Sequence, residues 1–60
     1  MNPISLTAWR NRLGLNKTEA ASALGLSRNA YAGYETGITR IPLYIALACA
    51  ALSYGLPPIR

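Results

Sequence analysis

Hydrophobic residues recur at helical spacing in four short stretches of the chain. In the first stretch, Leu6, Trp9 and Leu13 follow one another at intervals of three and four residues, which puts them on one face of a helix. Ser5 is a residue type that caps the start of a helix, and Gly14 is a type that ends one. The pattern therefore predicts a helix that starts after Ser5, ends at Gly14 and buries one apolar stripe.

Only two residues separate the next two predicted helices. The earlier one begins at Asn16, which has the spacing of a capping box with Glu19, and it ends at Gly25. The later one begins after Ser27, a good N-cap residue, and ends at Gly37. The residues expected to form the apolar faces of this pair are Ala20, Ala21, Leu24, Leu26, Tyr31 and Tyr34.

The short connection between these two helices predicts how they meet. With only Gly25 and Leu26 between them, Gly25 is expected to adopt the left-handed conformation, which ends one helix abruptly and lets the next start at a steep angle. Ala21 lies where the two helices would come closest, so a small side chain suits that position. This is the arrangement of a helix-turn-helix, whose second helix stands clear of the domain and can enter a major groove.

The fourth predicted helix, from Pro42 to Tyr54, is apolar on every side. Gly55 and then Pro57-Pro58 are expected to stop it. Such a helix must be covered all round. The first three helices can cover only one side, so the remainder is predicted to meet a second copy in a two-fold dimer. One apolar face carries Leu43, Leu47, Ala50 and Tyr54, and the residues assigned to the dimer interface are Ile45, Ala46, Ala48, Cys49 and Leu52. At about 20 Å the helix is too short to span a membrane.

The composition narrows the chemistry further. A chain of 60 residues makes one small domain with marginal stability of its own. A single cysteine cannot close an internal disulfide, and the absence of histidine with only two carboxylates leaves no ligand set for a structural metal. The same counts argue against an enzyme, because acid-base catalysis needs groups that the chain lacks. We therefore expect no metal, no cofactor and no small-molecule ligand, and support from a second subunit.

Charge is unevenly distributed along the chain. Six basic residues against two acidic ones give a net charge of +4, and residues 41–59 carry no charge at all. A basic domain of this kind usually binds a polyanion, most often nucleic acid. The start of the chain has no basic segment followed by an apolar run, and a lone Cys49 suits a reducing compartment. These features predict a cytoplasmic protein.

The segment from Leu15 to Gly37 resembles the helix-turn-helix of the phage repressor and Cro-type family. The matching features are the small residue at Ala21, the turn Gly25-Leu26-Ser27 and the ending Glu35-Thr36-Gly37. A looser likeness extends from Leu6 to about Leu52. The resemblance implies a sequence-specific DNA-binding regulator that binds palindromic operators as a dimer. It also implies an ion pair between Arg10 and Glu35. Family domains commonly have a fifth helix, and relatives often carry a long polar side chain where this chain has Gly33.

Base contacts are expected from the start of the third helix. Arg28 can bond bidentately to guanine and Asn29 to adenine, each contributing about 1 to 3 kcal/mol of discrimination. Ala32 could touch a thymine methyl group, and Gly33 could allow close approach. In the alternative interpretation, Arg28 is solvated or binds a phosphate and Asn29 only helps to cap the helix.

Phosphate contacts are expected from helix starts and from the basic flank. The free N–H groups at the start of the second helix form an anion site. The candidates, with Lys17 first, are Asn16, Lys17, Ser27, Thr39, Arg40 and Tyr44. A solvated side chain is the alternative for each, and for Arg12 it is the preferred one. Trp9, Tyr31 and Tyr34 fall on the inward stripes of their helices, which favours a core over a stacking platform for single strands.

Together these patterns predict an all-α, compact four-helix domain of the repressor helix-turn-helix type, with four to five helices allowed. One domain fills residues 1–60, with the helix-turn-helix at about 16–36 and the dimerisation helix at about 42–54. The predicted function is a repressor or autoregulator of phage or mobile-element type that binds an inverted repeat with its third helices about 34 Å apart. The alternatives are an antitoxin-like or protein-interaction module that binds a partner through the fourth helix, and a nonspecific nucleic-acid binder.

Overall fold

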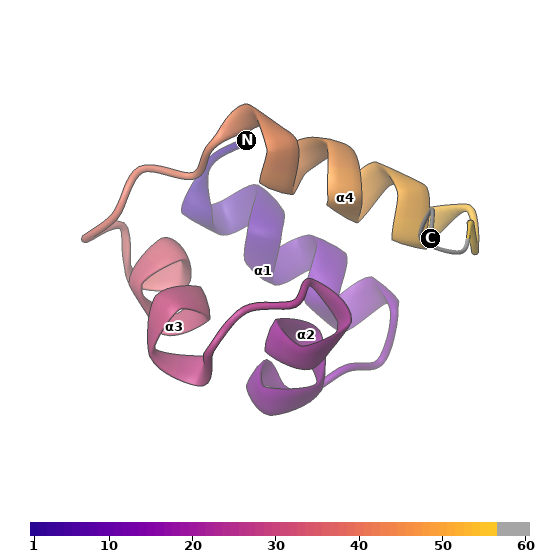
Figure 1. Cartoon of the computed structure of the whole chain (residues 1–60), viewed down its shortest axis with the longest axis horizontal. Coiled ribbons are helices and arrows are strands. Elements are labelled where there is room, and N and C mark those ends of the chain that lie inside the picture. Colours follow the sequence, from indigo (N-terminus) through magenta and orange to yellow (C-terminus); the bar gives the residue numbers. More distant parts are fainter. Residues whose placement is uncertain (57–60) are drawn as a thin grey trace.

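A computed structural model describes residues 1–56 as four helices with no strand among them (Figure 1). They are α1 (Pro3–Arg12), α2 (Lys17–Ala23), α3 (Arg28–Thr36) and α4 (Leu43–Ser53). The predicted all-α class and the order of the four helices are confirmed. The helix stop expected at Pro57-Pro58 lies outside the described residues.

Two of the helix starts are capped as the sequence predicts, and α1 starts earlier. Asn16 and Glu19 form the capping box of α2, and the Ser27 hydroxyl accepts from the Ala30 N–H at the start of α3. The prediction of Ser5 as the first cap is wrong. Asn2 caps α1, and its side chain accepts the Ser5 N–H at 2.7 Å. An Asn followed by Pro at the first helical position is the stronger start signal, because proline has its φ already in the helical range and has no N–H to satisfy.

The turn between α2 and α3 depends on Gly25. Its φ of +71° lies in the left-handed region, which glycine enters without steric cost. The Leu26 N–H then donates to the Ala21 carbonyl at 2.8 Å, which closes the end of α2. The buried Ala21 side chain lets α3 pack against α2. The turn therefore has the geometry that the sequence predicts.

The core joins all four helices around α1. In Figure 1, α1 lies between α4 on one side and the α2–α3 pair on the other. Each helix contributes two buried residues, and these are Leu6, Trp9, Ala20, Ala21, Tyr31, Tyr34, Ile45 and Cys49. The buried Trp9 indole N–H donates to the Cys49 carbonyl at 3.0 Å. This bond satisfies the only polar atom of the indole and ties α1 to α4.

The inner face of α4 is the one that the sequence assigned to the dimer interface. Ile45 and Cys49 are each 1% exposed in the single chain, so their assignment to a subunit interface is wrong. Leu52 also packs against the core, and Ala46 and Ala48 are half-buried. The outward face carries Leu43, Leu47, Ala50 and Tyr54. Both faces of this helix are apolar, so the sequence pattern alone does not say which one the domain buries.

Candidate nucleic-acid interface

The outer face of α3 begins with two exposed polar side chains. Tyr31 and Tyr34 point into the core, whereas Arg28 and Asn29 are exposed on the first turn. The Ser27 hydroxyl accepts the Ala30 N–H, and the Ser27 carbonyl accepts the Tyr31 N–H. The N–H groups of Arg28 and Asn29, the first two residues of the helix, have no partner within it. The first turn of α3 therefore offers two side chains and two N–H groups to a ligand that approaches it.

Farther along α3, the chain covers part of its own helix. Ala32 and Gly33 are half-buried, unlike the residues of the first turn. The Thr39 N–H, from the loop after α3, donates to the Gly33 carbonyl at 3.2 Å. A Cβ atom at Gly33 would lie 3.0 Å from the Thr39 hydroxyl oxygen. The loop therefore leaves little room for a side chain at Gly33. The sequence had suggested instead that Gly33 allows the close approach of DNA.

The start of α2 is a smaller anion site than the sequence suggested. The Glu19 carboxylate accepts the Asn16 N–H at 2.9 Å, and the Asn16 side chain accepts the Glu19 N–H at 2.8 Å. The capping box therefore occupies two of the amides counted as free and places a negative charge beside them. Lys17 is exposed and retains its own free N–H, as does Thr18.

The remaining phosphate candidates lie in the loop after α3 and at the start of α4. Thr39 and Arg40 are exposed, and Tyr44 is exposed on the first turn of α4. Ile38, in the same loop, is 86% exposed. Sequence reasoning did not single out Ile38, because an isolated apolar residue between a glycine and polar residues gives no periodic signal.

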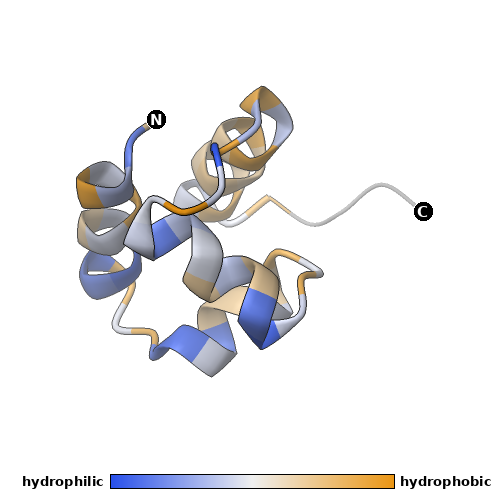
Figure 2. Ribbon diagram, turned by 90° about the vertical axis from the view of Figure 1, so that its left-hand side faces the viewer, coloured by the Kyte–Doolittle hydropathy of each residue, from blue (hydrophilic) through white to orange (hydrophobic). Residues whose placement is uncertain are grey.

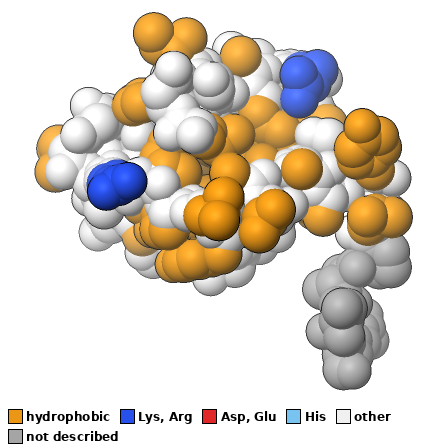
Figure 3. Space-filling model, turned by 90° about the horizontal axis from the view of Figure 1, so that it is seen from above, with side chains coloured by type: hydrophobic (Ala, Val, Ile, Leu, Met, Phe, Trp, Pro, Cys, Tyr) orange, Lys and Arg blue, Asp and Glu red, His pale blue; other side chains and the backbone are white. Residues whose placement is uncertain are grey.

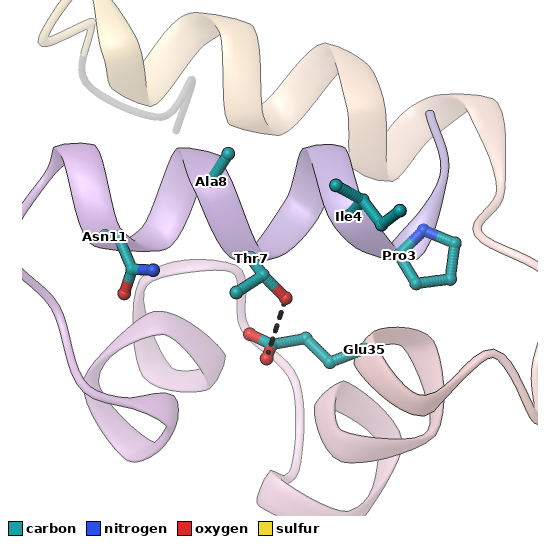
Figure 4. A pocket seen from close by; sticks show the side chains of 6 residues that line it. All are labelled: Pro3, Ile4, Thr7, Ala8, Asn11 and Glu35. Carbon is teal, nitrogen blue, oxygen red and sulfur yellow. Dashed lines mark hydrogen bonds between the residues drawn. The ribbon is translucent and has the colours of Figure 1, made fainter.

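Arg10 and Glu35 form the ion pair that fastens α1 to α3. Arg10 Nε donates to Glu35 Oε2 at 2.8 Å, with 15% and 6% of the two side chains exposed. Thr7 Oγ1 donates to Glu35 Oε1 at 3.1 Å (Figure 4), and Arg10 Nη1 donates to the Leu15 carbonyl at 3.2 Å. Sequence reasoning missed Thr7, whose hydroxyl lies one turn before Arg10 on α1.

The surroundings of the ion pair shift the pKa values of Glu35 and of its neighbour Tyr31. Burial opposes ionisation of the Glu35 carboxyl, but the hydrogen bonds from Arg10 and Thr7 outweigh it and hold its pKa below the ordinary value. Burial raises the pKa of Tyr31, whose hydroxyl is buried beside them without a hydrogen-bond partner among the described residues. Glu35 is therefore ionised in the folded protein and is already satisfied by its neighbours.

A shallow hollow of about 370 Å³ lies beside Glu35. It is lined by Pro3, Ile4, Thr7, Ala8, Asn11 and Glu35, most of them from α1 (Figure 4). The one charged group in the lining is the Glu35 carboxylate, which is engaged with Arg10 and Thr7. Within residues 1–56, no three metal-ligating side chains lie close enough together to hold an ion.

The outward face of α4 is a large exposed apolar surface. Leu47 and Tyr54 are 62% and 83% exposed, and Leu43 and Tyr44 are exposed beside them. Figure 3 looks onto the side of the molecule that carries α4 and shows hydrophobic side chains spread over it, and Figure 2 shows mostly hydrophobic colours along this helix. None of the helices in residues 1–56 has the length and apolar character needed to cross a membrane.

These features define a class of protein. A helix that follows a left-handed glycine turn, packs on its predecessor through Ala21 and exposes Arg28 and Asn29 is the second helix of a helix-turn-helix. A family model described as helix-turn-helix matches residues 6–52, so the chain belongs to this family of DNA-binding regulators. This confirms the resemblance to the phage repressor and Cro-type proteins. Neither the curated proteins nor the solved structures contain a match to the chain.

Proposed function

We propose that the protein is a sequence-specific transcriptional regulator, of the kind that phages and mobile elements use as repressors, and that it binds an inverted repeat as a homodimer. The observation that carries this proposal is the capped and uncovered first turn of α3, with Arg28 and Asn29 exposed on it. Such a protein acts where the DNA is transcribed, in the cytoplasm.

Arg28 and Asn29 are the residues we assign to base recognition. Both side chains are exposed on the first turn of α3, the end of the helix that enters the major groove first in this class of domain. The guanidinium of Arg28 matches the two acceptors of guanine, and the amide of Asn29 matches adenine. Ala32 follows on the same side, where its methyl group suits a thymine methyl.

Phosphate contacts fix the domain on the duplex. Lys17 is our first candidate, because its side chain is exposed at the start of α2 and no acidic side chain within residues 1–56 forms an ion pair with it. Arg40 supplies a second positive charge, from the loop after α3. The neutral candidates, which donate from an amide or a hydroxyl, are Asn16, Ser27, Thr39 and Tyr44.

A second copy is the partner we propose for the outward face of α4. The exposed stripe of Leu43, Leu47, Ala50 and Tyr54 is apolar and carries no charge, as the centre of a homodimer interface does. Ala50 has a small side chain that allows two helices to approach closely. The same exposed stripe also favours a second candidate function, an antitoxin-like module in which another protein covers α4.

Selection from random duplex DNA at physiological salt tests the proposal. We expect a two-fold symmetric consensus whose half-sites are about one helical turn apart. Arg28→Ala should reduce the preference for one base at a symmetric pair of positions by about 5- to 150-fold. Arg12→Ala, which removes an exposed arginine from α1, is the matched control and should retain that preference.

Lys17→Ala separates positioning from recognition. It should weaken binding to all duplexes by a similar factor and lower the slope of binding against salt by about one. Retention of full base preference by Arg28→Ala would contradict the assignment of base recognition. A stable complex with another protein and no selected DNA sequence would favour the second candidate function.

A further inference from the structure

The loop after α3 lies against the recognition helix at Gly33. Gly37 ends α3 with a φ of +83°, in the left-handed region, and turns the chain back. The Gly33 carbonyl then accepts two hydrogen bonds at 3.2 Å, one from the Thr39 N–H and one from the Thr36 hydroxyl. These contacts hold Thr39 against the second turn of α3.

The position of Gly33 on the helix decides what this contact means. Gly33 follows Asn29 by four residues, so the two positions are neighbours on one face of α3, turned away from Tyr31 and Tyr34. A Cβ atom at Gly33 would point at the Thr39 side chain, 3.0 Å from its hydroxyl oxygen and 3.7 Å from its Cβ. The Thr39 hydroxyl thus occupies the space into which a side chain at position 33 would extend, and Thr39 is itself exposed.

The geometry points to Thr39 as a specificity-determining residue that reads bases in place of a side chain at position 33. The inference rests on the proposed function and deepens it. It also changes the role expected for Thr39, from a phosphate contact to a base contact. A threonine hydroxyl can both donate and accept a hydrogen bond, and its methyl group can contact the methyl group of thymine. The base pair concerned is the one beside the pair that Asn29 contacts.

Two substitutions at Thr39 test the chemistry directly. Thr39→Val keeps the shape of the side chain and removes the hydroxyl, whereas Thr39→Ser keeps the hydroxyl and serves as the matched control. Affinities are measured for the selected operator and for the set of duplexes that carry each other base pair at every position. We expect Thr39→Val to reduce discrimination about fivefold or more at one symmetric pair of positions, and Thr39→Ser to retain most of it.

Gly33→Ala provides a second, independent probe. The added methyl group would lie 3.0 Å from the Thr39 hydroxyl oxygen, so the Thr39 side chain must move by a few tenths of an ångström. We expect Gly33→Ala to alter base preference at the same positions that Thr39→Val affects. Thermal unfolding monitored by circular dichroism establishes that each variant is folded.

Three outcomes would overturn the inference. In the first, Thr39→Val loses the same affinity on every duplex, which marks a phosphate contact. In the second, Thr39→Val binds every duplex with unchanged affinity. In the third, Gly33→Ala alters base preference at positions that Thr39→Val does not affect. Each of these outcomes leaves the proposed function in place if Arg28→Ala still reduces base preference at the positions assigned to Arg28. If both Thr39→Val and Arg28→Ala keep full base preference, the result would instead count against the proposed function.

Discussion

Replacement of Arg10 by methionine tests how firmly α1 holds α3. Methionine keeps much of the apolar stem and removes the guanidinium, which leaves the Glu35 carboxylate with Thr7 as its remaining hydrogen-bond donor. The Leu15 carbonyl loses its Arg10 partner as well. Glu35 would then carry a charge in a site where its side chain is 6% exposed.

The size of the effect follows from that burial. Removing one partner of a fully buried pair costs about 3 to 5 kcal/mol, and an exposed pair contributes less than about 1 kcal/mol. With 15% and 6% of the side chains exposed, this pair lies near the buried limit, and we expect a loss of about 2 to 3 kcal/mol. For a domain of this size, that lowers the melting temperature by about 10 to 20 °C.

A double-mutant cycle with thermal unfolding measures this loss. The variants are Arg10→Met, Glu35→Gln and the pair together, at one protein concentration, with Arg12→Met as the control for loss of an exposed arginine from the same helix. The control should change stability by less than about 0.5 kcal/mol. Equal effects of Arg10→Met and Arg12→Met, or a coupling energy near zero, would refute the reasoning.

The pH dependence gives a second measure of the same pair. The pKa of Glu35 is lower in the folded protein than its ordinary value, so the carboxylate stabilises the fold at neutral pH. This contribution is present above the pKa of the unfolded chain and is lost as pH falls through the folded pKa. The free energy of unfolding should therefore fall less between pH 7 and pH 3 in Glu35→Gln than in the wild type.

Two further predictions concern the outward face of α4 and the turn before α3. Leu47→Glu should convert the proposed dimer to a folded monomer in sedimentation, whereas Ile38→Glu, at a more exposed apolar position away from α4, should leave it dimeric; a dimeric Leu47→Glu would place the interface elsewhere. Gly25→Ala should cost about 1 to 2 kcal/mol of stability in urea unfolding, because Gly25 has a φ of +71°, although no atom of the described residues lies within 4 Å of the added Cβ; an unchanged midpoint would exclude backbone strain there.

The local signals in the sequence were sufficient for most of the fold. The capping box at Asn16 and Glu19, the cap at Ser27 and the glycine turn at Gly25 are each encoded within a few residues, so pattern and propensity predict them. The first helix start was misplaced because Ser5 and Asn2 are both cap residues. Only the proline that follows Asn2 distinguishes them.

The features that the sequence did not predict depend on contacts between distant residues. Which apolar face of α4 is buried depends on Trp9, whose indole bonds to the Cys49 carbonyl forty residues away. The fit between Gly33 and Thr39 requires the loop to fold back over α3, and no periodic pattern encodes that approach. The ion pair of Arg10 and Glu35 was implied by family resemblance alone, since nothing local links two residues on different helices.

The proposed function requires that α3 recognises base edges in the major groove through Arg28. The most direct test uses the selected operator with 7-deazaguanine at the guanine whose preference Arg28→Ala removes, since this analogue lacks the major-groove N7 acceptor. Inosine at the same position, which lacks only the minor-groove amino group of guanine, is the control. We predict that 7-deazaguanine weakens wild-type binding about fivefold or more and leaves Arg28→Ala unaffected, whereas inosine changes neither. Sensitivity to inosine with no response to 7-deazaguanine would contradict the account.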